Sequence, residues 1–151
     1  MKLILEKWQK FINEELDIKI KKFDGLVCPK ATQDLALNTK NRDATIKKYN
    51  YGPLNVDEPG DYWQKIAAYW KTTEKAARKS VCGNCVAFDI SPRMKDCMPG
   101  DTFDDDGELG YCWMHHFKCH SARACHTWAK GGPIANNNES AEWQEKSEIK
   151  K

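Results

Sequence analysis

Six of the chain's seven cysteines and all four of its histidines lie between residues 82 and 134. The N-terminus carries no recognisable secretory signal, and no apolar run approaches the roughly 20 residues of a membrane span, so we expect a cytoplasmic setting or a particle assembled there. In that setting disulfides are a poor explanation for so many cysteines, because cellular thiols keep cysteine pairs reduced. The stretch is therefore expected to bind a metal ion or an iron–sulfur cluster.

Cys82-x2-Cys85 forms a tight chelate at the start of this stretch. Two intervening residues let both sulfurs approach one centre, and Gly83 removes a side chain where the loop is tightest. Backbone N–H groups near Gly83 and Gly110 are expected to hydrogen-bond the sulfurs. A redox dithiol is the least favoured interpretation, because no βαβ pattern surrounds the pair. Zinc and an iron–sulfur cluster remain.

Two sets of ligands satisfy the spacing. Cys82, Cys85, Cys112 and His115 give C-x2-C-x26-C-x2-H, a fair pattern for structural zinc. Cys125 in place of His115 gives C-x2-C-x26-C-x12-C, four thiolates suited to a [4Fe-4S] cluster. Aromatic residues near the cysteines favour the cluster, which needs a wide apolar wall to exclude water. The wall candidates are Phe88, Tyr111, Trp113, Phe117 and Trp128.

Three short motifs, CGNCVAF at residues 82–88, GYCW at 110–113 and CHTWAK at 125–130, resemble those of the high-potential iron–sulfur proteins. The resemblance implies that Cys82, Cys85, Cys112 and Cys125 ligate one [4Fe-4S] cluster and that the protein carries one electron at a time. The gap between the second and third of these cysteines is longer than is usual in that family, and it contains Cys97. Cys97, His115 and Cys119 are therefore alternative ligands, although Cys97 and Cys119 also fit as small buried hydrophobic residues.

The longer arrangement from residue 32 through residue 134, which is most of the chain, is similar to small proteins carried by marine tailed bacteriophages. This resemblance implies a place in the cytoplasm of an infected host cell or in the virion, with a redox partner protein or a phage structural protein as partner. Residues 1–22 are predicted to form an amphipathic helix, whose apolar stripe is Leu5, Trp8, Phe11, Ile12 and Leu16. Within it, Ile12-Asn13-Glu14 resembles the processing site of phage targeting peptides.

The rest of the chain divides by composition. Residues 23–80 are predicted to be a loop-rich and helical extension with one helix from about Asn41 to Tyr49. A second helix is predicted to begin after Asp61 as N-cap and to pack its tryptophans over the cysteine-rich part of the chain. Residues 81–134 form the cluster-binding domain, and residues 135–151 a poorly ordered or weakly helical polar tail. The predicted fold is a small α plus irregular, loop-rich domain like that of the high-potential iron–sulfur proteins, with an N-terminal helical extension.

Other features exclude some functions. Residues 1–80 carry 16 Lys and Arg against 11 Asp and Glu, and residues 81–151 carry 8 against 11, so no basic stripe for nucleic acid is expected. The acidic stretch at residues 101–110 does not match a calcium loop and is expected to be a solvated loop. Cys28 is expected to be a buried or free thiol. No catalytic residue is expected, because four cysteine ligands leave no open iron; the alternative function is a zinc- or cluster-stabilised structural or interaction protein of a phage particle.

Overall fold

The computed structural model describes residues 27–149, with side chains described to residue 147. The predicted amphipathic helix of residues 1–22 and its processing site lie outside the described residues. Among the described residues, no helix combines the length and the apolar character needed to cross a bilayer.

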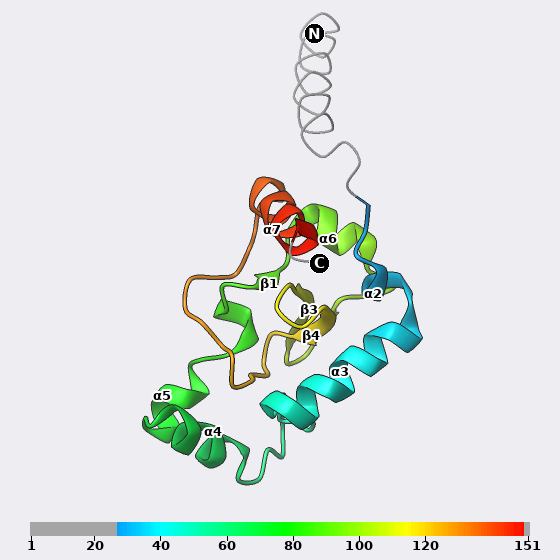
Figure 1. Ribbon diagram of the computed structural model, residues 1–151. Helices are drawn as coiled ribbons and strands as arrows, with labels where there is room; N and C mark the ends of the chain where they lie inside the picture. Colours follow the sequence, from blue (N-terminus) through cyan, green and yellow to red (C-terminus); the bar gives the residue numbers. More distant parts are fainter. Residues whose placement is uncertain (1–26, 150–151) are drawn as a thin grey trace, which may run out of the picture.

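A small antiparallel sheet of four strands lies at the centre of a mixed α/β fold (Figure 1). The strands are β1 (Phe88–Asp89), β2 (Phe103–Asp104), β3 (Gly107–Cys112) and β4 (Phe117–His120). The helices are α2 (Lys30–Gln33), α3 (Leu35–Tyr49), α4 (Tyr62–Trp70), α5 (Glu74–Arg78), α6 (Pro92–Cys97) and α7 (Asn137–Ile149), with a 3₁₀ turn, η1, at Cys82–Asn84. The helices agree with the predicted α plus irregular fold, but the sequence analysis missed the sheet.

Strand β3 pairs with each of the other three strands. Its C-terminal half lies between β1 and β4, where Cys112 is opposite Phe88 on one side and Phe117 on the other. Gly110 is required at the centre of the sheet, because a Cβ there would come within 2.6 Å of the Phe88 ring. The register pairs Gly110 with Cys119. Because residues two apart on a strand share a face, Cys112 and Cys119 lie on the same face of the hairpin.

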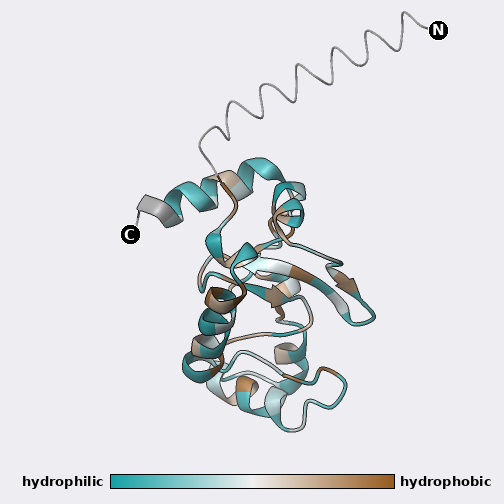
Figure 2. Ribbon diagram, turned by 90° about the vertical axis from the view of Figure 1, so that its right-hand side faces the viewer, coloured by the Kyte–Doolittle hydropathy of each residue, from teal (hydrophilic) through white to brown (hydrophobic). Residues whose placement is uncertain are grey.

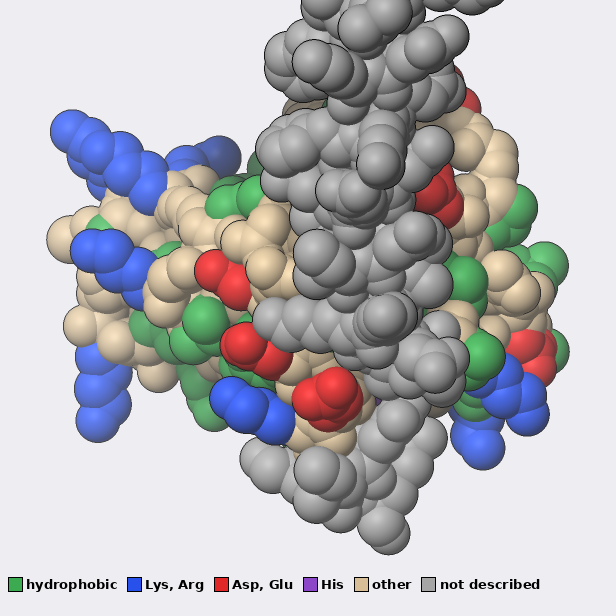
Figure 3. Space-filling view, turned by 90° about the horizontal axis from the view of Figure 1, so that it is seen from above, with side chains coloured by type: hydrophobic (Ala, Val, Ile, Leu, Met, Phe, Trp, Pro, Cys, Tyr) green, Lys and Arg blue, Asp and Glu red, His purple; other side chains and the backbone are tan. Residues whose placement is uncertain are grey.

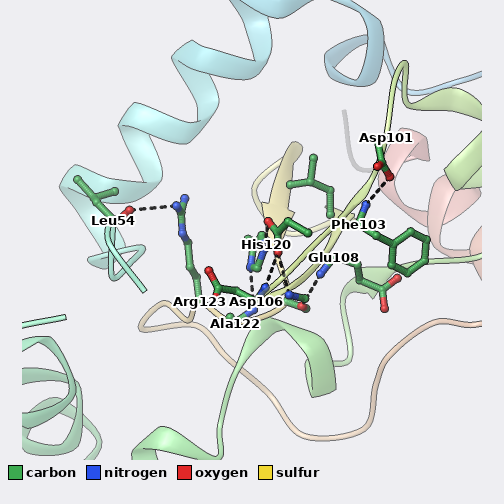
Figure 4. Close-up of polar contacts among 12 residues, drawn as sticks. Leu54, Asp101, Phe103, Asp106, Glu108, His120, Ala122 and Arg123 are labelled. Carbon is green, nitrogen blue, oxygen red and sulfur yellow. Dashed lines mark hydrogen bonds and ion pairs between the residues drawn. The ribbon is translucent and has the colours of Figure 1, made fainter. Parts of the chain in front are cut away.

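The acidic stretch at residues 101–110 is exposed to solvent over residues 103–106, as predicted, but it forms the β2–β3 hairpin and not a loop (Figure 4). Asp104 Oδ1 accepts hydrogen bonds from the backbone N–H groups of Asp106 and Gly107, which close the turn. Its other oxygen lies 2.8 Å from His120 Nε2, while His120 Nδ1 accepts from the Ala122 N–H. The hydrogen bond from His120 lowers the pKa of the Asp104 carboxyl. Turn-forming aspartates therefore account for much of this acidic run.

Two helices were predicted within residues 23–80, and both are present. Helix α3 ends at Tyr49 as predicted but begins at Leu35, because the Asp34 side chain accepts a hydrogen bond from the Leu37 N–H and caps the helix. Asp61 stands at the N-cap position of α4, yet its carboxylate makes no capping hydrogen bond and pairs with Lys65 instead. Trp63, Ile66 and Ala67 pack in a small core with Ala124 of the cysteine-rich part. Trp70 donates a hydrogen bond to the His126 carbonyl at 3.0 Å, and its ring lies 5.9 Å from that of Trp128, so the tryptophans of α4 do pack against the cysteine-rich part.

The C-terminal segment predicted as a poorly ordered or weakly helical tail contains the 13-residue helix α7, which lies against α6 at one end of the molecule (Figure 1). Figure 2 shows that α7 is mostly hydrophilic. Ala141 is buried and Trp143 packs against the core, but much of the contact is polar: the Arg93 guanidinium of α6 donates to Ser140 Oγ at 2.6 Å and to the Gln144 side chain. A sequence analysis based on apolar residues misses a helix that is held by buried hydrogen bonds.

Asp89 joins α7 to the sheet through a carboxylate that is fully buried. One oxygen accepts hydrogen bonds from Trp113 Nε1 at 2.9 Å and from the Ser140 hydroxyl, and the other accepts from the Ser91 N–H at 2.9 Å. Replacing Asp89 with alanine leaves three buried donors without this acceptor. We expect the free energy of unfolding, measured by urea denaturation, to fall by about 3 kcal/mol.

Asp89→Asn is the matched control for this substitution. It keeps one oxygen acceptor and nearly the same volume, so its loss of stability should be clearly smaller than that of Asp89→Ala. Equal losses in the two variants would show that the hydrogen bonds to the carboxylate do not hold α7 in place.

Candidate metal centre

Five cysteines line one cavity: Cys82, Cys85, Cys112, Cys119 and Cys125. Phe88, Met114, Thr127 and Trp128 complete the lining. The structure therefore brings together all four cysteines that were predicted as cluster ligands. It adds Cys119, which the sequence analysis held as an alternative. We refer to this space as the thiol cavity.

The first two cysteines are fixed against the segment that carries the last one. The Cys82 N–H donates to the Arg123 carbonyl at 2.6 Å, and the Gly83 N–H donates to the Ser121 carbonyl at 3.0 Å. A Cβ at Gly83 would lie 3.2 Å from that same Ser121 oxygen, so glycine permits the close approach of the two segments. The Gly83 N–H joins the two backbones, so it is not among the N–H groups near Gly83 that were expected to hydrogen-bond a sulfur.

Each of the four predicted cysteines begins a backbone turn. The carbonyls of Cys82, Cys85 and Cys125 accept from the N–H three residues later, at 2.9, 3.1 and 3.1 Å. The Cys112 carbonyl accepts from the His116 N–H, four residues later, at 2.8 Å. Cys119 differs, since it lies inside strand β4.

These turns aim backbone N–H groups at sulfur. Cys85 receives hydrogen bonds from the amides of Ala87 and Ala129. Cys112 receives them from the amides of Met114 and His115, and Cys125 from that of Thr127. Donors of this kind favour the thiolate over the thiol, which is the form that binds metal.

At most of these sulfurs, burial raises the thiol pKa and so opposes the backbone N–H groups, which lower it. It raises the pKa of Cys85 and Cys119, and it raises the pKa of Cys125 to about 12. A hydrogen bond from Cys119 instead lowers the pKa of Cys112. Since only thiolates ligate, binding of a metal at these cysteines must release protons.

The thiols of the cavity influence one another's ionisation. Besides burial, the neighbouring thiols of Cys112 and Cys82 raise the pKa of Cys119. Charge on Cys82 and Cys112 likewise raises the pKa of Cys85 and Cys125. The five thiols therefore cannot all ionise independently.

His115, the imidazole of the predicted zinc pattern, is absent from the lining of the thiol cavity. Its Nε2 lies 2.6 Å from Thr127 Oγ1, and its ring stacks on Tyr49 with a centroid distance of 4.6 Å. Thr127 Oγ1 lies 3.2 Å from Cys125 Sγ, so His115 reaches that sulfur only through the threonine. The C-x2-C-x26-C-x2-H donor set is not gathered around this cavity.

Cys28 and Cys97 form a disulfide that closes a separation of 69 residues. The prediction of Cys28 as a free or buried thiol is wrong, and Cys97 is unavailable as a ligand while its sulfur is bonded to Cys28. The expectation that the cysteines stay unpaired also fails for these two. No spacing rule relates cysteines so far apart, since their approach depends on α2 and α6 meeting in the folded chain.

The predicted aromatic wall is present in part. Phe88 and Trp128 line the thiol cavity, and the Trp128 indole is held by hydrogen bonds from Nε1 to the Val81 carbonyl and to Asn84 Oδ1. Tyr111, Trp113 and Phe117 are buried but lie outside the lining. Tyr111 and Trp113 flank Cys112 at the end of a strand, where neighbouring side chains point to opposite faces, and they line a separate cavity beside Cys28. Met114, which was not predicted, completes the wall.

The thiol cavity is narrow, with a volume of about 10 Å³, which is room for one water molecule. Within residues 27–149, no three His, Cys, Asp or Glu side chains are grouped closely enough to hold a single metal ion. The donor chemistry fits an iron–sulfur cluster, since free thiols surround one space and N–H groups point at several of them. A cubane is larger than this space, so the thiols would have to turn outward to admit it.

Comparison with known proteins adds no relative. No protein-family model matches the chain, no curated protein matches it, and no solved structure matches it. The function has to be argued from the thiol cavity itself.

Proposed function

We propose that Cys82, Cys85, Cys112 and Cys125 ligate one [4Fe-4S] cluster and that the protein carries one electron at a time. The observation that carries the proposal is the turn that begins at each of these four cysteines. Three of their sulfurs receive hydrogen bonds from backbone amides. Hydrogen bonds to the sulfurs are one of the main determinants of the potential of an iron–sulfur cluster.

The surroundings favour the more oxidised couple of such a cluster. Phe88 and Trp128 cover it with apolar rings, and four of the five cavity cysteines are buried along with Phe88. A cubane with four thiolates already carries about two negative charges in its middle state, and a dry site disfavours a third. Four cysteine ligands leave no open iron for a substrate, so the proposed role is electron transfer and not catalysis.

Cys119 is the fifth thiol and is not assigned as a ligand. It lies in strand β4, where the backbone is paired with β3, and the turn after the strand begins at His120 and not at Cys119. The turn that begins at each of the other four cysteines is the feature that Cys119 lacks. We assign it as a buried thiol beside the cluster.

A second candidate is a structural zinc ion, which suits the narrowness of the thiol cavity but would require the thiols to move closer together, since no three of them are grouped around one point. A single ion needs less space than a cube and would be held by thiolates alone, since His115 lies elsewhere. Zinc would then supply folding free energy to a small core. The protein would be a structural or interaction module, with a phage structural protein as the proposed partner.

Anaerobic purification followed by metal, acid-labile sulfide and visible-absorption analysis separates the two. The proposal expects a brown protein with about four irons and four sulfides per chain, and a reversible one-electron couple in a redox titration. A colourless protein with about one zinc per chain rejects the cluster and supports the structural module.

A further inference from the structure

The thiol cavity is closest to solvent at one side. Of the residues that line it, Met114 is the most exposed, at 37%, while four of the five cysteines and Phe88 are buried. Thr127 and Trp128 are half-buried beside it. An electron that leaves a cluster in this cavity by the shortest path would therefore emerge at Met114, Thr127 and Trp128.

Contacts join this side of the cavity to the C-terminal ends of α3 and α4. His115 follows Met114, bonds Thr127 and stacks on Tyr49, the last residue of α3. His126 precedes Thr127 and stacks on Tyr69 of α4, with ring centroids 3.7 Å apart. Tyr69 is 59% exposed. We call this surface, from Met114 through Thr127 and His126 to Tyr69, the Met114–Tyr69 face.

The charged residues in the segments that form this face are all basic, and four lysines lie close along the chain to its aromatic residues. Lys47 and Lys48 precede Tyr49, Lys71 follows Trp70, and Lys130 follows Trp128 by two residues; all four are exposed. The segments that form the face, residues 44–56, 62–73 and 109–138, contain no Asp or Glu. The acids next along the chain to α4, Asp61 and Glu74, are each paired with a base one turn later.

The opposite end of the molecule is different. Viewed from the side of α6 and α7, acidic and basic side chains are intermingled (Figure 3). The absence of acids is thus a property of the segments around the Met114–Tyr69 face, and it gives that face a single sign of charge.

We propose that the Met114–Tyr69 face is the surface on which an acidic patch of a protein redox partner docks. The inference rests on the proposed electron-transfer function and adds the site and chemistry of the partner. Lysines at the rim attract and orient an acidic surface, while exposed Met114 and Tyr69 supply apolar contact at its centre. Four lysines spread around aromatic residues suit a protein surface better than the continuous basic stripe that nucleic acid requires.

A redox-inert anion tests the surface directly. Hexacyanochromate(III) is paramagnetic and broadens the NMR signals of the residues it approaches, whether or not an electron is transferred. The amide signals of Tyr69, Lys71 and Lys130 should broaden at lower concentrations of the anion than those of Lys30 and Lys146. Broadening that is uniform over the surface, or that is strongest near α7, would overturn the inference.

Charge reversal with a matched control tests the same face through electron transfer. Lys71→Glu with Lys130→Glu should slow the oxidation of the reduced protein by hexacyanoferrate(III) about tenfold at low ionic strength. Lys30→Glu with Lys146→Glu makes the same change of charge at other exposed positions and should leave the rate near that of the unmodified protein. One electron passes from protein to oxidant, which becomes hexacyanoferrate(II), and no bond forms or breaks.

The outcomes separate this inference from the proposed function. A cluster-loaded protein that responds equally to the two pairs of substitutions overturns the docking surface and leaves the cluster in place. A protein without a cluster overturns the proposed electron-transfer function. The broadening by hexacyanochromate(III) then shows by itself whether the Met114–Tyr69 face attracts anions. A stronger affinity of the face for a single-stranded oligonucleotide than for polyglutamate would assign it to nucleic acid and reject the protein partner.

Discussion

Cys112→Ser is expected to remove the cluster, so that iron falls from about four per chain to a small fraction of one and the visible absorption disappears. Cys112 lies at the end of β3, where its sulfur receives hydrogen bonds from the amides of Met114 and His115 and meets Cys119. The hydroxyl of serine is a poor ligand for iron, and the turn that begins at residue 112 would then present no thiol to the cavity. Iron and sulfide analysis of the protein purified without oxygen measures the loss.

Cys119→Ser is the control for this substitution. It changes the same atom in a buried thiol that lines the same cavity, but in a strand and not at the start of a turn. The variant should keep about four irons per chain, with at most a shift in reduction potential from the altered hydrogen bonding to neighbouring sulfur. Loss of iron in Cys119→Ser, together with its retention in Cys125→Ser, would show that Cys119 is the fourth ligand.

Replacing both Cys28 and Cys97 with alanine should lower the free energy of unfolding by about 4 kcal/mol, because the disulfide closes a loop of 69 residues that is otherwise free in the unfolded chain. The bond also ties α2, next to the start of the described chain, to the end of α6. Urea denaturation followed by tryptophan fluorescence measures the change. A thiol reductant should destabilise the unmodified protein by a similar amount and have no such effect on the double variant.

The same double variant also tests whether the two disulfide cysteines are separate from the cysteines that bind the metal. Its iron content should equal that of the unmodified protein, since Cys28 and Cys97 bond to each other and lie outside the thiol cavity. A loss of iron without a comparable loss of stability would mean that Cys97 is a ligand and that the disulfide does not form when metal is bound.

The sequence identified the cysteines around the cavity because their spacing is a local property. Cys82 and Cys85 each begin a backbone turn, and the second turn directly follows the first. Turns also bring the aromatic residues three positions after Cys85 and Cys125 to the wall of the cavity. The same signal misled at Cys112. Tyr111 and Trp113 are its direct neighbours, but β3 places direct neighbours on opposite faces, so both rings point away from the cavity.

The features that the sequence did not reveal depend on long-range pairing. Strands β1 and β2 have two residues each, too few to show alternation of polar and apolar positions. Cys119 faces the cavity because the register sets it opposite Gly110, on the same face as Cys112. Helix α7 lacks an apolar stripe that a sequence pattern could reveal. Hydrogen bonds to the buried side chains of Ser140 and Gln144, one of them from Ser140 to Asp89, hold it in place instead.

Iron K-edge X-ray absorption of the protein purified without oxygen tests the central claim most directly, because it reports the atoms around the metal itself. The proposed centre predicts that each iron is surrounded by about four sulfurs, with other irons as the next neighbours. An absence of iron with zinc present, or an iron environment with nitrogen or oxygen neighbours and no second iron, would contradict it.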